Sequence, residues 1–235
     1  MECPCWIEFD FSNYPMSSFE EIRASVWDIN NPQHTIFHNQ EGVAHIIEVS
    51  QGSHEITVIR GLQNSEYDDG VVSIPTGFQA DSIYACTQRI ECIGETLRYM
   101  PMAYRQFATI TLTIKDENLA ENVKDLRIIG DTNGINCRNM APIQGVLEFL
   151  LPVSTEHIYH FRVPRQRIDS VLELDLVRLS GEVVTLPIGS WIIASGYDWY
   201  AADLEEIDIL IDHSDSFTTV TISGWSDGTE YIMEF

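Results

Sequence analysis

The chain has 235 residues, 44% of them hydrophobic and 21% charged, which is enough to bury a core and too apolar for a disordered tail. Its 36 acidic residues outnumber its 13 Lys and Arg residues, and the net charge is −23. A surface this negative repels phosphate backbones, so we expect no nucleic-acid partner.

The first predicted strand is WIEFDF at residues 6–11, which places Ile7, Phe9 and Phe11 on one face and two acidic residues on the other. This period of two is typical of half-buried strands. It recurs in IRASVWD (22–28), HEITVIRG (54–61), FATITLTI (107–114) and VLELDLVRL (171–179). Helical periodicity is confined to SSFEEIR (17–23), DENLAENVKDL (116–126) and YAADLEE (200–206). None of these could make the long helices of a βαβ layout, so the sequence predicts an all-β, sandwich-like protein.

A domain boundary is expected within residues 94–101, where one series of strands closes and a new series opens. The length of the chain also allows two small domains. We therefore predict an N-terminal β-sandwich domain over residues 1–98 and a C-terminal one over 99–235. Because no Gly/Ser-rich linker separates them, the two should pack directly against each other.

Motifs for metal binding or catalysis are weak. Cys3 and Cys5 form a CPC that resembles half of a metal knuckle, but no second pair follows at a zinc-like interval. GDTNG at 130–134 lacks the carboxylate spacing of a calcium loop, and an Asn-Gly turn between strands explains it better. No nucleophile elbow, phosphate loop or zinc-protease motif occurs. We predict no enzyme activity, no metal and no cofactor.

The five cysteines are an odd number, which argues against a complete disulfide framework. We expect them to be mainly small buried side chains, with room for one disulfide bridge among them. The sequence leaves their pairing open.

The acidic segment GYDWYAADLEEIDILID, residues 196–212, raises the question of a catalytic or metal-binding cluster. From Glu206 the pattern alternates, with isoleucines on one face and Asp208 and Asp212 on the other. Those two carboxylates would lie about 13 Å apart on a strand, too far to share a metal ion or a proton. A second alternating run, TTVTISGW, follows a short polar turn. The segment is therefore predicted to form a hairpin with a solvated acidic face.

Aromatic residues near this hairpin allow two interpretations. Trp191, Trp199 and Tyr200 could form a glycan-binding surface, as a cell-surface glycan-binding module would have. They could equally cap the sandwich and fill its core, the commoner role of large aromatics.

Several segments, taken in order, resemble the FimB-type minor fimbrial subunits of the fimbrillin family, which build type V pili. The resemblance rests on CPCWIEFDFS (3–12), SFEEIRASVWD (18–28), IPTGFQADSIYA (74–85), RQFATITLTI (105–114), GDTNG (130–134), FRVPRQ (161–166) and the closing block from Gly196 to Trp225. It covers nearly the whole chain, and the order of the motifs is more specific than any one of them.

The resemblance implies two tandem transthyretin-like β-sandwich domains and a structural role in cell-surface fimbriae, as the anchor or an accessory subunit. It implies attachment to the outer membrane through an N-terminal lipid. The sequence carries neither the signal peptide nor the lipid-bearing cysteine, and we expect Cys3 and Cys5 not to be the lipid site. The given residues are therefore expected to be the soluble part of a longer chain.

The resemblance also implies that other fimbrial subunits are the partners and that they join by strand addition, in which an extended segment of one chain completes an open sheet of another. The C-terminal EYIMEF, with Tyr231, Met233 and Phe235 on one side, could be donated or could be the last strand of its own domain. The N-terminal strand, with Ile7, Phe9 and Phe11, is the one that a partner would replace or cover.

Overall fold

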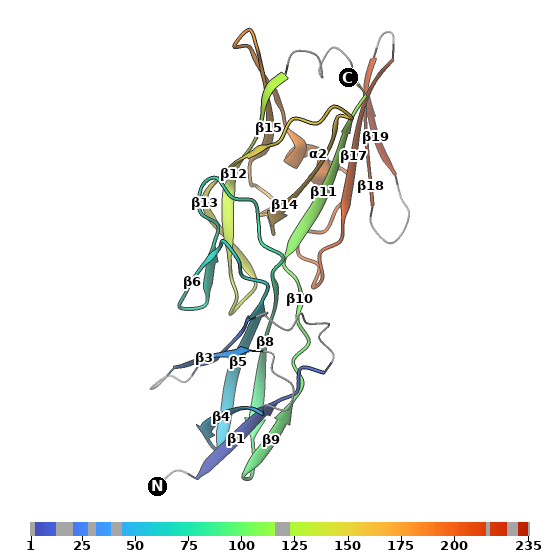
Figure 1. Cartoon of the computed structure of the whole chain (residues 1–235). Coiled ribbons are helices and arrows are strands. Elements are labelled where there is room, and N and C mark those ends of the chain that lie inside the picture. Colours follow the sequence, from blue (N-terminus) through green and yellow to red (C-terminus); the bar gives the residue numbers. More distant parts are fainter. Residues whose placement is uncertain are drawn as a thin grey trace.

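The structure, a computed structural model, describes residues 3–12, 21–27, 32–38, 44–115, 123–214, 217–224 and 230–234. The molecule is elongated, and its strands lie in four sheets distributed over two halves along the long axis (Figure 1). Within the described residues, no helix is long and apolar enough to cross a bilayer.

The N-terminal half is built from a three-stranded sheet, in the order β4-β1-β9, and a five-stranded sheet, in the order β10-β8-β5-β2-β3. Its strands are β1 (Pro4–Phe9), β2 (Glu21–Trp27), β3 (Gln33–His38), β4 (His45–Ser50), β5 (Gly52–Arg60), β8 (Tyr84–Cys92), β9 (Thr96–Tyr99) and β10 (Tyr104–Arg105). Alternate side chains of both sheets point inward and form one apolar cluster, which includes Ile7, Ile22 and Ile56. This is the packing of a β-sandwich.

The C-terminal half contains a five-stranded sheet, β14-β11-β17-β18-β19, and a six-stranded sheet that includes β16-β15-β12-β7-β6, with β13 also paired to β12. Its elements are β6 (Glu66–Asp68), β7 (Val71–Ser73), β11 (Phe107–Ile114), β12 (Val123–Asn136), β13 (Ala141–Leu151), β14 (Ile158–Pro164), β15 (Leu172–Arg178), β16 (Val183–Leu186), α2 (Ile188–Ala194), β17 (Ile207–Ser214), β18 (Phe217–Ser223) and β19 (Tyr231–Glu234). The main hydrophobic cluster of the protein lies between these two sheets.

The hairpin β6–β7 links the two halves. Although its residues precede β8 in the chain, β7 pairs antiparallel with the end of β12, with Val72 opposite Ile135. A separate apolar cluster forms where the halves meet, from residues on both sides: Ile59, Val72, Ile83, Ala85, Ile135 and Cys137. The predicted boundary between residues 98 and 99 stays a prediction, and the chain crosses between the halves before it as well as after it.

The all-β prediction is confirmed. The turn predicted at 132–134 is wrong, because β12 runs through GDTNG as a continuous strand, with register shifts on either side of Thr132 that mark a bulge. Segment 200–206 forms bends and turns instead of a helix, and the helix of this region is α2. The other two candidate helices, at 17–23 and 116–126, fall largely outside the described residues.

Candidate functional site

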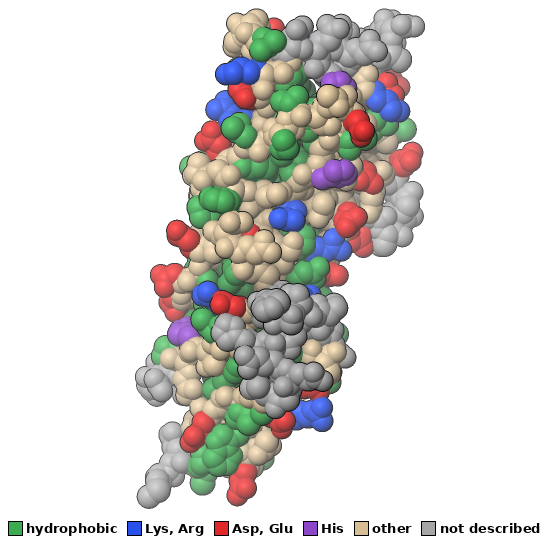
Figure 2. All heavy atoms as spheres, viewed as in Figure 1, with side chains coloured by type: hydrophobic (Ala, Val, Ile, Leu, Met, Phe, Trp, Pro, Cys, Tyr) green, Lys and Arg blue, Asp and Glu red, His purple; other side chains and the backbone are tan. Residues whose placement is uncertain are grey.

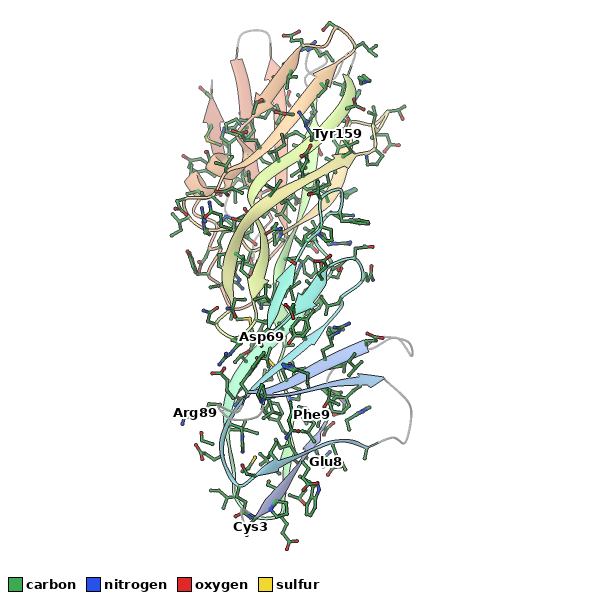
Figure 3. The ribbon with its side chains drawn as sticks, turned by 90° about the vertical axis from the view of Figure 1, so that its left-hand side faces the viewer. Cys3, Glu8, Phe9, Asp69, Arg89 and Tyr159 are labelled. Carbon is green, nitrogen blue, oxygen red and sulfur yellow. The ribbon has the colours of Figure 1, made fainter. Side chains whose placement is uncertain are left out.

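The N-terminal strand β1 occupies the centre of the three-stranded sheet, antiparallel to β4 and parallel to β9. Ile7 and Phe9 point into the core and are fully or almost fully buried. The Phe11 ring lies 5.8 Å from the Phe9 ring and packs against the same cluster. Figure 3 labels Phe9 beside its outward-facing neighbour Glu8 near the end of this half. A partner can therefore reach the inner face of this strand only by displacing β1.

The C-terminal strand β19 lies at the edge of the other half's five-stranded sheet and pairs antiparallel with β18. Tyr231 and Met233 stand opposite the buried Ile222 and Val220, and Met233 packs against the main core. Ile232, on the other face, is 57% exposed. Phe235 lies outside the described residues. Among the described strands, β19 has a neighbour on one side only.

The alternating part of the acidic segment, from residue 207, forms the strand β17, as predicted, in a hairpin with β18. Ile207, Ile209 and Ile211 are buried, Asp208 is exposed and Asp212 is half-buried. Across the part of the chain that is described, no group of three or more His, Cys, Asp or Glu residues could hold a metal ion. Figure 2 shows acidic side chains spread over both halves of the visible face. The acidic face of the hairpin therefore has the solvated character that its alternation predicts.

The loop before β17 is held by a buried arginine on the segment after β14. The guanidinium of Arg165 donates hydrogen bonds to the Trp199 carbonyl (2.6 Å), the Gln106 side-chain oxygen (3.0 Å) and the Ala202 carbonyl (3.4 Å). Burial lowers the pKa of Arg165 from its usual value. The loop also contacts the connection between the halves, where the Arg105 N–H donates to an Asp203 carboxylate oxygen at 2.6 Å.

Two of the three predicted ligand-binding aromatics, Trp199 and Tyr200, lie on this loop, and the third, Trp191, lies on α2. Trp199 is 2% exposed and its ring meets that of Tyr197 edge-to-face at 4.8 Å. Trp191 lies on the buried side of α2, in the main core. Tyr200 alone of the three faces solvent, with 58% of its surface exposed. The structure thus does not bring the three rings together on an open surface, and both indoles fill core space.

A polar cavity of about 400 Å³ lies on the outer face of β2 and β3, beside the β6–β7 turn. The residues that line it are Arg23, Ala24, Ser25, His34, Thr35, Ile36, Tyr67, Asp68 and Asp69. Figure 3 places Asp69 in the region where the halves meet. The sequence shows Arg23 and Ser25 alternating with buried apolar residues, but not that a hairpin from the other half would stand over them.

The floor of the cavity is held by a small hydrogen-bond network. Ser25 is almost fully buried, and its hydroxyl bonds to His34 Nδ1 and to the Tyr67 hydroxyl, each at 2.9 Å. Burial raises the pKa of Tyr67, so this phenol stays protonated. The Arg23 guanidinium lies 5.6 Å from the Tyr67 ring centre, and its buried Nε has no hydrogen-bond partner among the described residues. The cavity therefore offers hydroxyl, cationic and anionic groups together.

No protein-family model matches the chain, and no curated protein sequence matches it. Solved structures do. The fimbrial anchor protein Mfa2 from Porphyromonas gingivalis aligns with a TM-score of 0.68 at 10% identity, over 95% of this chain and 98% of that one. The chain shares its fold with a fimbrial anchor protein.

Two further structures have a similar fold. A candidate polysaccharide-binding protein from Bacteroides thetaiotaomicron aligns over 99% of this chain and 98% of its own, with a TM-score of 0.67 at 13% identity. A candidate adhesin from Bacteroides ovatus aligns over 99% and 95%, with a TM-score of 0.62 at 10% identity. The similarity to fimbrial subunits that the sequence indicates is therefore confirmed as a common fold, with β-sandwich character in both halves.

Proposed function

We propose that this chain is a non-enzymatic structural subunit of cell-surface fimbriae, acting as the anchor or as an accessory subunit. The observation that carries the proposal is the fold shared with a fimbrial anchor protein over 95% of the chain. The order of the fimbrillin-like motifs along the sequence also supports it. Other fimbrial subunits are the partners.

We propose strand addition as the way these partners join. β19 supports this, because it is a short edge strand that holds to the rest of the molecule through one neighbour. Its alternating faces, with Tyr231 and Met233 inward and Ile232 outward, suit a segment that could dock in the same manner on another sheet. At the other end, β1 is the strand that a partner would displace.

The architecture and location follow from the same proposal. The two halves would be tandem transthyretin-like domains, residues 1–98 and 99–235, and a lipid carried upstream of the given residues would hold the protein at the outer membrane. The exposed Cys3 stands near the end of the N-terminal half (Figure 3), so that a membrane attachment at this end would direct the C-terminal half outward.

The test is to delete residues 230–235 in the native host and to follow the protein by immunogold labelling. Under the proposal, the truncated protein remains folded and at the cell surface but fails to enter fibres, or alters their length. Ile232→Lys, on the exposed face of β19, is the matched variant, because it adds a charge without removing the inward side chains. Normal incorporation and fibre length after the deletion would contradict donation of β19, while label unrelated to any fibre would contradict the fimbrial function itself.

Glycan binding, as a cell-surface module or a tip adhesin, is the second candidate function, and one observation favours it. The cavity beside β2 and β3 has a size typical of small-molecule sites and combines hydroxyl, anionic and cationic groups with the Tyr67 ring and Ile36, which suits the hydroxyls and C–H faces of a sugar. The test is saturation-transfer NMR with single neutral sugars, comparing the wild type with Asp68→Asn. A signal that is lost in the variant supports this function, and no signal with any sugar would contradict it.

A further inference from the structure

Two buried cysteines meet in the core of the N-terminal half. Cys5 is 0% exposed and Cys92 is 1% exposed, and both belong to the same hydrophobic cluster. The Cys5 thiol is close enough to Cys92 to contribute to the raised pKa of that residue. Cys5 lies on β1, in the three-stranded sheet, whereas Cys92 is the last residue of β8, in the five-stranded sheet. The pair therefore spans the two layers of the sandwich.

The course of the chain explains why these residues are close. After Cys92, only residues 93–95 separate β8 from β9, and β9 pairs directly with β1. The Trp6 N–H donates to the Glu95 carbonyl at 2.8 Å, which fixes the start of β1 against this turn. Facing sheets are usually about 10 Å apart, but at such a corner they converge. The corner thus brings the Cys5 and Cys92 side chains within reach of each other.

We propose that Cys5 and Cys92 form a disulfide bond that ties β1 to β8. The remaining cysteines do not compete well for this pairing. Cys86 stands six residues earlier on β8, about 20 Å along the strand from Cys92. Cys137 belongs to the cluster between the halves, and Cys3 is exposed.

The bond forms by thiol–disulfide exchange with a small disulfide such as oxidised glutathione. One cysteine thiolate attacks a glutathione sulfur and releases one glutathione thiol. The second cysteine then attacks the mixed disulfide and releases the other. The two cysteines lose two protons and two electrons, and the reagent is reduced to two thiols. Burial, together with the neighbouring Cys5 thiol, raises the pKa of Cys92, so exchange requires β1 to open and is fastest during folding.

The consequence for assembly rests on the proposed function. If a partner displaces β1, the disulfide closes that route, because the strand becomes covalently fixed to the opposite sheet. Oxidised protein would then keep its own N-terminal strand and could present only its C-terminal half to a neighbour. The bond itself is tested without any fibre, so its absence would leave the fimbrial proposal untouched.

The experiment is to refold the whole chain with oxidised and reduced glutathione and to map its peptides without reduction. We expect a peptide that links residues 5 and 92, lighter by about 2 Da than the two reduced peptides together. The oxidised protein should melt about 10 °C higher than the same protein with reductant, because the bond closes a loop of about 90 residues.

Cysteine variants make the result specific. Each variant is compared with itself, oxidised against reduced, so that a loss of basal stability does not confuse the outcome. Cys5→Ala and Cys92→Ala should abolish the redox-dependent shift, while Cys137→Ala, which removes a buried thiol in the other cluster, should keep it. A linkage of Cys92 to Cys3 or Cys86, or a wild-type melting temperature that is independent of redox state, would overturn the proposal.

Discussion

Asp81 holds a loop at the junction of the two halves through its carboxylate. It is almost fully buried, and one of its oxygens accepts hydrogen bonds from the backbone N–H groups of Gln63, Asn64 and Ser65, at 2.8, 2.9 and 2.7 Å. Burial opposes the charge, but these donors outweigh it and lower the pKa of Asp81 below its usual value. The charged form is therefore the one that stabilises the fold.

We expect Asp81→Asn to lower the free energy of unfolding by about 2 kcal/mol at pH 7, since charge-assisted hydrogen bonds become neutral ones. A depressed pKa stabilises the folded state above the unfolded-state pKa, and this contribution is lost as the pH falls through the folded-state pKa. The difference between wild type and variant should therefore shrink below about pH 4. Urea denaturation at pH 7 and pH 3 measures it, with the exposed Asp208→Asn as a control. An equal difference at both pH values would contradict the role of the charge.

A second prediction concerns Arg165. Its planar guanidinium reaches three acceptors that a lysine ammonium cannot reach together. Arg165→Lys should lower the free energy of unfolding by about 3 kcal/mol, by leaving buried carbonyls unpaired. Its measure is chemical denaturation together with the tryptophan emission maximum, which should shift to longer wavelength as Trp199 meets water. Arg167→Lys is the control, because the partners of Arg167, Asp131 and Asp169, are nearer the surface. It should change the free energy of unfolding and the emission maximum much less.

At the scale of elements, alternation predicts strands well and their neighbours poorly. The faces of β1, β11, β17 and β18 follow from their sequences, because a period of two decides which side chains are buried. The parallel pairing of β1 with β9 cannot be predicted from this alternation, since it depends on the turn between β8 and β9, about 90 residues later in the chain. GDTNG gives a wrong prediction of a turn, because Asn-Gly usually forms one. Here β12 has a partner strand on each side, and the segment stays extended.

The helix α2 is not predicted from the sequence, although a helical pattern is present there. Ile188, Trp191 and Ile192 recur at the helical spacing and are the residues that it buries. Because the helix has only two turns and no charged residues at its ends, its sequence looks like another apolar strand. The buried state of Trp191 and Trp199 depends on this helix and on the Arg165 loop, so their faces could not be assigned beforehand.

The pairing of β7 with β12 requires a glycine at position 134. A Cβ there would lie 2.1 Å from the Val72 carbonyl oxygen, in the backbone of the facing strand. We expect Gly134→Ala to separate these strands and to cost about 2 kcal/mol. Gly145→Ala is the matched control, because its Cβ would meet the end of the Asn133 side chain, which can rotate away. Thermal unfolding compares the two, and equal melting temperatures would mean that the β7–β12 contact carries little stability.

At the scale of the whole molecule, the hairpin β6–β7 makes the C-terminal half depend on residues that precede β8 in the sequence. We expect residues 99–235 expressed alone to melt well below the full chain, because the end of β12 loses its partner and Ile135 becomes exposed. A longer chain, residues 61–235, contains the β6–β7 hairpin and should recover most of the lost melting temperature. Calorimetry of the three chains tests this, and a melting temperature for 99–235 equal to that of the full chain would contradict it.

The same hairpin has a mechanical consequence. Two domains joined by a single linker can rotate freely relative to each other. Here the chain crosses the junction between the halves three times: at both ends of segment 61–83, and again near residues 104–107. These three crossings, together with the apolar cluster at the junction, resist bending and twisting of one half relative to the other. The molecule should therefore behave as a stiff rod, in which whatever fixes the direction of one end also sets the direction of the other.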